Sequence, residues 1–123
     1  MDELLKEQLE ENGANIEAAI NRFMGNEEVL LKFLLGLKED ENFPQLRASL
    51  EEENFAEAFK RAHSIKGVYA NLGLDPIAGA ASAMTELLRG REAEEIDREE
   101  LWEMNEALEE AYELFLDLID EYA

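Results

Sequence analysis

Apolar side chains recur at steps of three and four residues along most of this chain, and this periodicity constrains the fold more than any other feature. The clearest run lies between residues 54 and 72. Its apolar positions are Phe55, Ala58, Phe59, Ala62, Ile65, Tyr69 and Leu72. Side chains at this spacing share one face of an α-helix, whereas a half-buried strand needs strict alternation. The pattern therefore predicts an amphipathic helix over residues 54–72.

The same spacing predicts three more long helices and two short ones. The long helices are expected over residues 27–40, 75–90 and about 97–119, and the short ones over about residues 2–11 and 16–24. Phe43 and Pro44 are expected to end the helix that starts at residue 27, with one or two further turns around Leu46 and Leu50. We predict an all-α fold, an antiparallel four-helix bundle of the long helices with the short N-terminal helices covering one end.

Length and composition agree with a single domain. The chain has 123 residues, of which 46 % are hydrophobic, and this is enough to fill one core. Ala, Leu and Glu, which favour helices, dominate the sequence, and there is no internal repeat or flexible linker. We expect one domain over residues 1–123, acting as a monomer.

The charge of the chain excludes several functions. With 31 acidic and 11 basic residues, the formal net charge is −20, which repels nucleic-acid phosphates and anionic membrane surfaces. No apolar run is long enough to span a membrane, and the charged N-terminus "MDELLKEQLEENG" lacks the pattern of an export signal, so we expect a cytoplasmic protein. The acidic runs "KEDEN", "EEEN" and "REAEEIDREE" lack the spacing of a calcium loop and are interpreted as solvated surface and helix starts, so no metal site is expected.

The only histidine, His63, lies in the predicted helix over residues 54–72. At about 100° per residue it falls on the flank of the apolar stripe and faces water. The residues that share its face lie three, four or seven positions away, and they are Ala56, Phe59, Lys66, Gly67 and Ala70. A glycine inside a helix destabilises it by about 1 kcal/mol relative to alanine, so the presence of Gly67 in this helix needs an explanation. A flat surface that lets another protein approach the imidazole would supply one.

This combination suits phosphoryl chemistry. An ordinary imidazole is largely unprotonated near neutral pH, so it is nucleophilic towards phosphorus without a strong base. The ammonium group of Lys66, one turn away, can neutralise an incoming phosphate. The alternative to a functional role is that His63 is an ordinary surface histidine next to a solvated lysine.

The stretch "RAHSIKGVYANLG" resembles the motif of the histidine phosphotransfer (HPt) domain of multistep two-component signalling, in its stand-alone bacterial form. That motif is His, two residues, Lys-Gly, five residues and Gly, and it is matched by His63, Lys66, Gly67 and Gly73. "AFKRAHSIKGVYANLGL" and "AASAMTELLRG" look like the paired central helices of such domains, and the likeness extends from about residue 12 to residue 90.

The resemblance implies a phosphocarrier without kinase activity of its own. His63 would accept a phosphoryl group from a receiver-domain aspartate or a kinase and pass it to a response regulator, and Lys66 would stabilise the phosphoryl oxygens. The receiver would dock on Ala56, Phe59, Gly67 and Ala70. Partners would be a response-regulator receiver domain or a hybrid histidine kinase, with no cofactor of this chain's own and magnesium held by the receiver.

Two residues depart from the family pattern, because Val68 and Tyr69 stand where small residues are common. By its angle on the helix, Tyr69 is expected to fill the core and not to block the site. Three alternatives stay open. They are an interaction module that is not phosphorylated, the dimerisation helices of a histidine kinase, and the phosphotransfer segment of a chemotaxis kinase. The sequence does not indicate which kinase or regulator is served, or the direction of phosphoryl flow.

Overall fold

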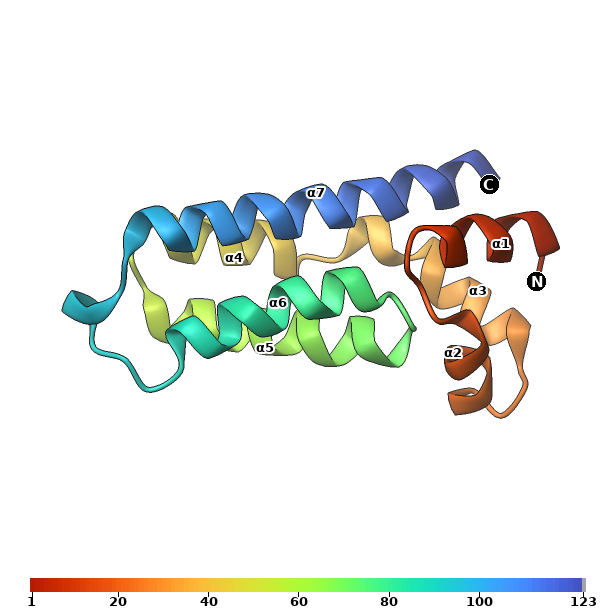
Figure 1. Ribbon diagram of the computed structural model, residues 1–123, viewed down its shortest axis with the longest axis horizontal. Coiled ribbons are helices and arrows are strands. Elements are labelled where there is room, and N and C mark those ends of the chain that lie inside the picture. The colour runs from red at the N-terminus through yellow and green to blue at the C-terminus, as the bar shows by residue number, and fades with distance from the viewer. Residues whose placement is uncertain (123) are drawn as a thin grey trace.

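The computed structural model describes residues 1–122, and this part of the chain is all-helical, as predicted (Figure 1). The α-helices are α1 (Glu3–Glu11), α2 (Ile16–Arg22), α3 (Glu27–Leu35), α4 (Asn42–Glu51), α5 (Phe55–Asn71), α6 (Asp75–Leu88) and α7 (Arg98–Tyr122). Two short 3₁₀ turns, η1 (Leu37–Glu39) and η2 (Ala93–Glu95), lie between them.

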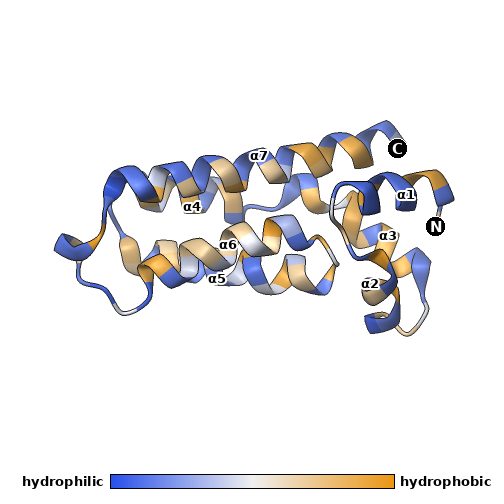
Figure 2. Ribbon diagram, in the orientation of Figure 1, coloured by the Kyte–Doolittle hydropathy of each residue, from blue (hydrophilic) through white to orange (hydrophobic). Residues whose placement is uncertain are grey.

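Helices α4, α5, α6 and α7 form an elongated antiparallel bundle (Figure 1). α5 and α6 make a tight hairpin, and α7 runs along the whole molecule beside α4 and α6. The helix α7 buries Leu101, Leu108, Phe115 and Ile119, and its other side is hydrophilic (Figure 2). Among the described residues, no helix is both long enough and apolar enough to cross a membrane.

The bundle uses a different first helix from the one predicted. The helix starting at residue 27 ends at Leu35, and α4 takes the place expected for residues 27–40. Gly36 is the C-terminal cap residue of α3, and α4 starts at Asn42. Between them, the Asp40 Oδ1 atom accepts a hydrogen bond from the backbone amide of Asn42 at 2.9 Å. Pro44 falls in the first turn of α4, where a missing N–H costs no helical hydrogen bond. The prediction that Pro44 ends the helix starting at residue 27 is therefore wrong.

Helices α1, α2 and α3 cover one end of the bundle, so three short helices stand where two were expected (Figure 1). Arg22 of α2 donates hydrogen bonds from Nη1 to the carbonyl oxygens of Ala70 and Asn71, at 2.7 and 3.2 Å. The backbone amide of Asn15 donates to the carbonyl of Gly73, at 2.7 Å. These bonds fasten the N-terminal helices to the C-terminal end of α5.

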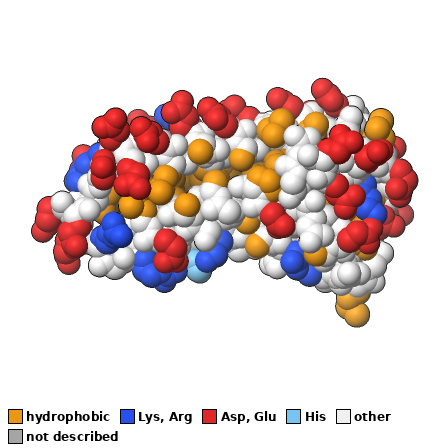
Figure 3. Space-filling view, in the orientation of Figure 1, with side chains coloured by type: hydrophobic (Ala, Val, Ile, Leu, Met, Phe, Trp, Pro, Cys, Tyr) orange, Lys and Arg blue, Asp and Glu red, His pale blue; other side chains and the backbone are white. Residues whose placement is uncertain are grey.

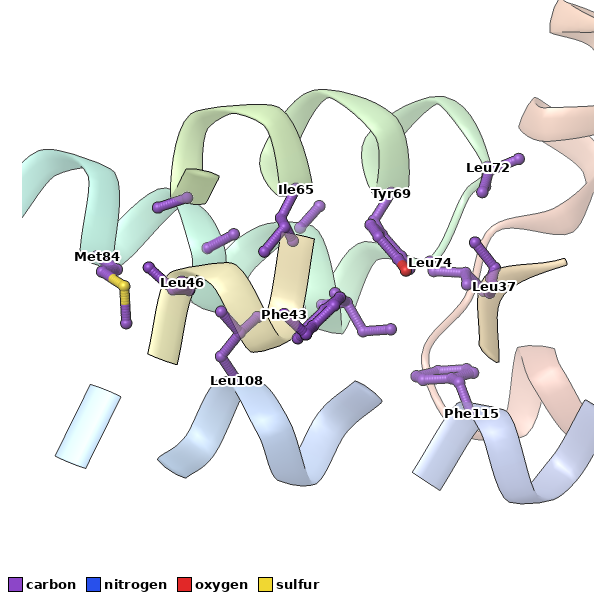
Figure 4. Packing of buried hydrophobic residues seen from close by; sticks show 14 of the residues in the cluster. Leu37, Phe43, Leu46, Ile65, Tyr69, Leu72, Leu74, Met84, Leu108 and Phe115 are labelled. Carbon is purple, nitrogen blue, oxygen red and sulfur yellow. The ribbon is translucent and has the colours of Figure 1, made fainter. Parts of the chain in front are cut away.

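The core next to this end is aromatic (Figure 4). Tyr69 is fully buried, and its ring packs edge-to-face against Phe43, whose ring stacks on Tyr112 at a centroid distance of 3.7 Å. The Tyr69 hydroxyl donates to the Oδ2 atom of Asp40 at 2.9 Å, which satisfies a polar group that burial would otherwise penalise. The expectation that Tyr69 fills the core is confirmed.

At the other end of the bundle, α4 meets α7 through a cation and an aromatic ring. The guanidinium carbon of Arg47 lies 5.5 Å from the centroid of the Trp102 ring. The same guanidinium makes two hydrogen bonds to the Glu109 carboxylate, at 2.6 and 3.0 Å. This contact holds the outer edges of the two helices together.

Candidate functional site

The long helix α5 places the histidine on the surface. Asn54 caps it, with its side-chain oxygen accepting a hydrogen bond from the Glu57 amide at 3.2 Å. Ala62 and Ile65 face the core and are fully buried, whereas His63 between them is exposed. The prediction that the imidazole faces water is confirmed.

The imidazole lies against an aromatic ring one turn earlier. The rings of His63 and Phe59 are 5° from parallel, with centroids 6.0 Å apart. Arg89, which follows the last residue of α6, places its guanidinium carbon 5.3 Å from the centroid of the same Phe59 ring. Sequence reasoning missed Arg89, because its proximity depends on how α6 packs on α5.

The lysines near the histidine differ from the neighbouring arginines, because Arg61 pairs with Glu57 and Arg89 pairs with Glu86. Lys60 is exposed and Lys66 is half-buried, and within residues 1–122 neither forms an ion pair. Lys and Arg side chains lie on both sides of the histidine along one edge of the molecule, while acidic side chains crowd the opposite edge (Figure 3). An anion that approaches His63 therefore meets free positive charge on a molecule of net charge −20.

Small residues leave the surface of α5 open beside the imidazole. A Cβ atom built on Gly67 meets no atom within 4 Å outside its own helix, so packing does not require glycine there. Ala56 is exposed and Ala70 is half-buried, and both lie on the same side of α5 as His63. The structure thus brings together on one face all six residues singled out from the sequence: Ala56, Phe59, His63, Lys66, Gly67 and Ala70.

The family model of the Hpt domain matches residues 1–117. The chain belongs to the Hpt domain family. The resemblance seen in the sequence is therefore confirmed, and the match extends well beyond residues 12–90. Hpt domains are phosphocarriers, not enzymes, and act in two-component signalling with receiver domains or kinases. No curated protein and no solved structure matches the chain.

The Hpt domain also carries an apolar groove that the sequence did not reveal. Val68, on α5, is 43 % exposed, and Phe33, on α3, is 54 % exposed. They line a groove of about 620 Å³ with Val29, Lys32, Gly36, Leu37, Asp40 and Asn42. Leu30, Phe33 and Leu37 follow one another at helical spacing, so periodicity alone places Phe33 in the core.

The ligand-binding side chains around His63 are basic. Within residues 1–122, no group of three or more His, Asp or Glu side chains is arranged to hold a metal ion. The side chains that the site offers to a ligand are one imidazole and the ammonium groups of Lys60 and Lys66. These groups suit the binding and transfer of an anionic group.

Proposed function

We propose that this protein is the phosphocarrier of a two-component phosphorelay and that His63 is its phosphoacceptor. The observation that carries the proposal is the single histidine in the family motif, exposed on a face with small residues, one turn before Lys66, which forms no ion pair within residues 1–122. A histidine with a purely structural role would be expected to hydrogen-bond within the fold. Within residues 1–122, the His63 side chain makes no hydrogen bond, and its contact is the stacked Phe59 ring.

The proposed reaction is direct transfer between an aspartate and the imidazole. The unprotonated ring nitrogen of His63 attacks phosphorus, and the bond from phosphorus to the aspartyl oxygen breaks. The aspartate leaves as a carboxylate, and the other ring nitrogen releases its proton to water. The reverse reaction passes the group to a second receiver aspartate. Most of the catalytic effect comes from positioning and charge neutralisation, with Lys66 beside the phosphoryl oxygens.

The proposed partner is a receiver domain of a response regulator or of a hybrid kinase. It would dock over Ala56, Phe59, Gly67 and Ala70, where the small side chains allow close approach. The receiver would bring its acidic pocket and the magnesium ion, and Lys60 and Lys66 would face that negative charge. A receiver partner also implies the cytoplasm, the compartment expected from the sequence.

Phosphorus NMR of the protein after incubation with phosphoramidate tests the proposal directly. The wild type is expected to give a phosphohistidine signal, and His63→Gln is expected to give none while it keeps the helical circular dichroism spectrum. A receiver domain phosphorylated by acetyl phosphate serves as a second donor. If the folded wild type takes up phosphate from neither donor, the function is that of an interaction module that is not phosphorylated.

A further inference from the structure

Two planar groups lie next to the Phe59 ring, one on α5 and one on the residue that follows α6. The Phe59 ring is nearly parallel to the imidazole of His63, and the guanidinium of Arg89 lies over it at 5.3 Å. Arg89 also contacts Glu86, with its Nε and Nη2 atoms each 3.3 Å from the carboxylate Oε1 atom. The Phe59 ring is half-buried, and the Arg89 guanidinium contacts it from the C-terminal end of α6.

The same helix contains a matched pair that lacks a histidine. Phe55, one turn before Phe59, is also half-buried, and the guanidinium carbon of Arg98 lies 5.1 Å from its ring centroid. A cation over a phenylalanine ring is therefore not special to the site. What distinguishes Phe59 is the imidazole stacked on it, which makes Phe55 an internal control.

We propose that Phe59 is a positioning residue for His63 and that Arg89 holds Phe59 in place, an inference that rests on the proposed function of His63. An exposed imidazole on a helix can occupy several rotamers, and only some of them present the ring nitrogen to an incoming phosphoryl group. Stacking on a fixed ring favours one plane for the imidazole before the donor arrives. Phe59 thus acts on the reaction through His63, in addition to contacting a docked receiver.

Docking and positioning make different predictions for a small donor. Phosphoramidate needs no protein surface on which to dock, so a residue that serves docking alone does not affect phosphoryl uptake from it. A residue that orients the imidazole affects uptake from every donor. The rate of uptake from phosphoramidate therefore isolates the positioning role.

The experiment compares Phe59→Leu, Phe59→Tyr and the control Phe55→Leu. Phe59→Leu is expected to slow uptake from phosphoramidate about threefold to tenfold, the range that the energy of an aromatic pair supports. Phe59→Tyr, which keeps the ring, is expected to retain the wild-type rate, and so is Phe55→Leu. The imidazole proton resonances of His63 are expected to shift in Phe59→Leu and to stay in place in Phe55→Leu, because the ring current of Phe59 is lost only in the first. Arg89→Gln is expected to move the same resonances part of the way.

Three results would overturn the inference. Wild-type uptake from phosphoramidate by Phe59→Leu, with slower transfer from a receiver domain alone, would leave Phe59 a docking residue. Equal slowing in Phe55→Leu would indicate a general effect on α5, which thermal unfolding of each variant would reveal. Unchanged His63 resonances in Phe59→Leu would show that the rings are not stacked in solution. Failure of the proposed function gives a different result, because the wild type itself would then take up no phosphate.

Discussion

Among single residues, Lys66 is expected to affect the rate of phosphoryl uptake but not the free energy of unfolding. Its ammonium forms no ion pair within residues 1–122, so Lys66→Ala is expected to change the free energy of unfolding by less than about 0.5 kcal/mol. Phosphoryl uptake by His63 is expected to slow about tenfold, because a charge-assisted contact to the phosphoryl oxygens is lost. Uptake kinetics and urea unfolding measure the two effects. Lys38→Ala, at an exposed lysine on η1, is the control. A large loss of stability in Lys66→Ala would instead assign a structural role to Lys66.

Tyr69 makes the stability of the fold sensitive to alkaline pH. Burial raises the pKa of Tyr69 far above its usual value, and the Asp40 carboxylate beside its hydroxyl raises it further. Burial also raises the pKa of Tyr112, to about 12. A group whose pKa is higher in the folded state stabilises that state fully below its unfolded pKa. This stabilisation is lost as the pH rises above about 10, where the unfolded tyrosines ionise and the folded ones do not.

The free energy of unfolding is therefore expected to fall from about pH 10 upward, by as much as about 1.4 kcal/mol per pH unit for each of these tyrosines. Tyr69→Phe is expected to be less stable than the wild type near neutral pH, because Asp40 loses its hydroxyl partner, and to show a shallower alkaline decline. Tyr122→Phe, at an exposed position, is the control. Equal alkaline slopes in the wild type and Tyr69→Phe would contradict the prediction.

At the scale of helices, two glycines of the motif have opposite structural requirements. Gly73 has a φ of +76°, and a Cβ atom there would lie 2.3 Å from the carbonyl oxygen of Asn15. Gly73→Ala is therefore expected to lower the free energy of unfolding by about 2 kcal/mol or more and to loosen α2 from the end of α5. Gly67→Ala meets no neighbour and is expected to raise it by about 0.5–1 kcal/mol.

The two variants also differ in the expected effect on transfer. Gly67→Ala is expected to slow transfer from a phosphorylated receiver domain, because a methyl group stands on the proposed docking face, and to leave uptake from phosphoramidate unchanged. Urea unfolding together with both kinetic assays measures this difference. A destabilised Gly67→Ala would mean that the glycine serves packing after all.

The buried and exposed faces of a helix could be predicted from the local spacing of apolar residues. The position of a helix in the bundle could not, because it depends on packing against other helices. The apolar stripe of α5 correctly predicted that Ile65 and Tyr69 are buried and that His63 is exposed, because the spacing of residues fixes the angle of each side chain around the helix axis. The replacement of residues 27–40 by α4 in the bundle was missed, because it depends on how α4 packs on α5 and α7. The contact of Arg89 with Phe59 was missed for a similar reason, since it joins two helices whose relative placement no periodicity encodes.

At the scale of the whole molecule, the net charge of −20 opposes the compact state. Several ion pairs, such as Arg98 with Glu53, are largely exposed and add little stability. Salt screens repulsion among the many acidic groups, so raising the NaCl concentration from about 10 mM to about 0.5 M is expected to raise Tm by about 5 °C. Circular dichroism during heating measures it. A lower Tm in high salt would mean that the ion pairs stabilise the fold more than repulsion destabilises it.

The contact between α4 and α7 also provides an optical signal. Trp102 is the only tryptophan of the chain, and its indole lies beneath the Arg47 guanidinium from the neighbouring helix. Its fluorescence emission therefore depends on the packing of α4 against α7. Neither Trp102 nor Arg47 is one of the stacked residues His63 and Phe59. Separation of the two helices would expose the indole to water and shift the emission to longer wavelength. Intrinsic fluorescence can thus follow unfolding of every variant of the phosphotransfer face with an unaltered reporter.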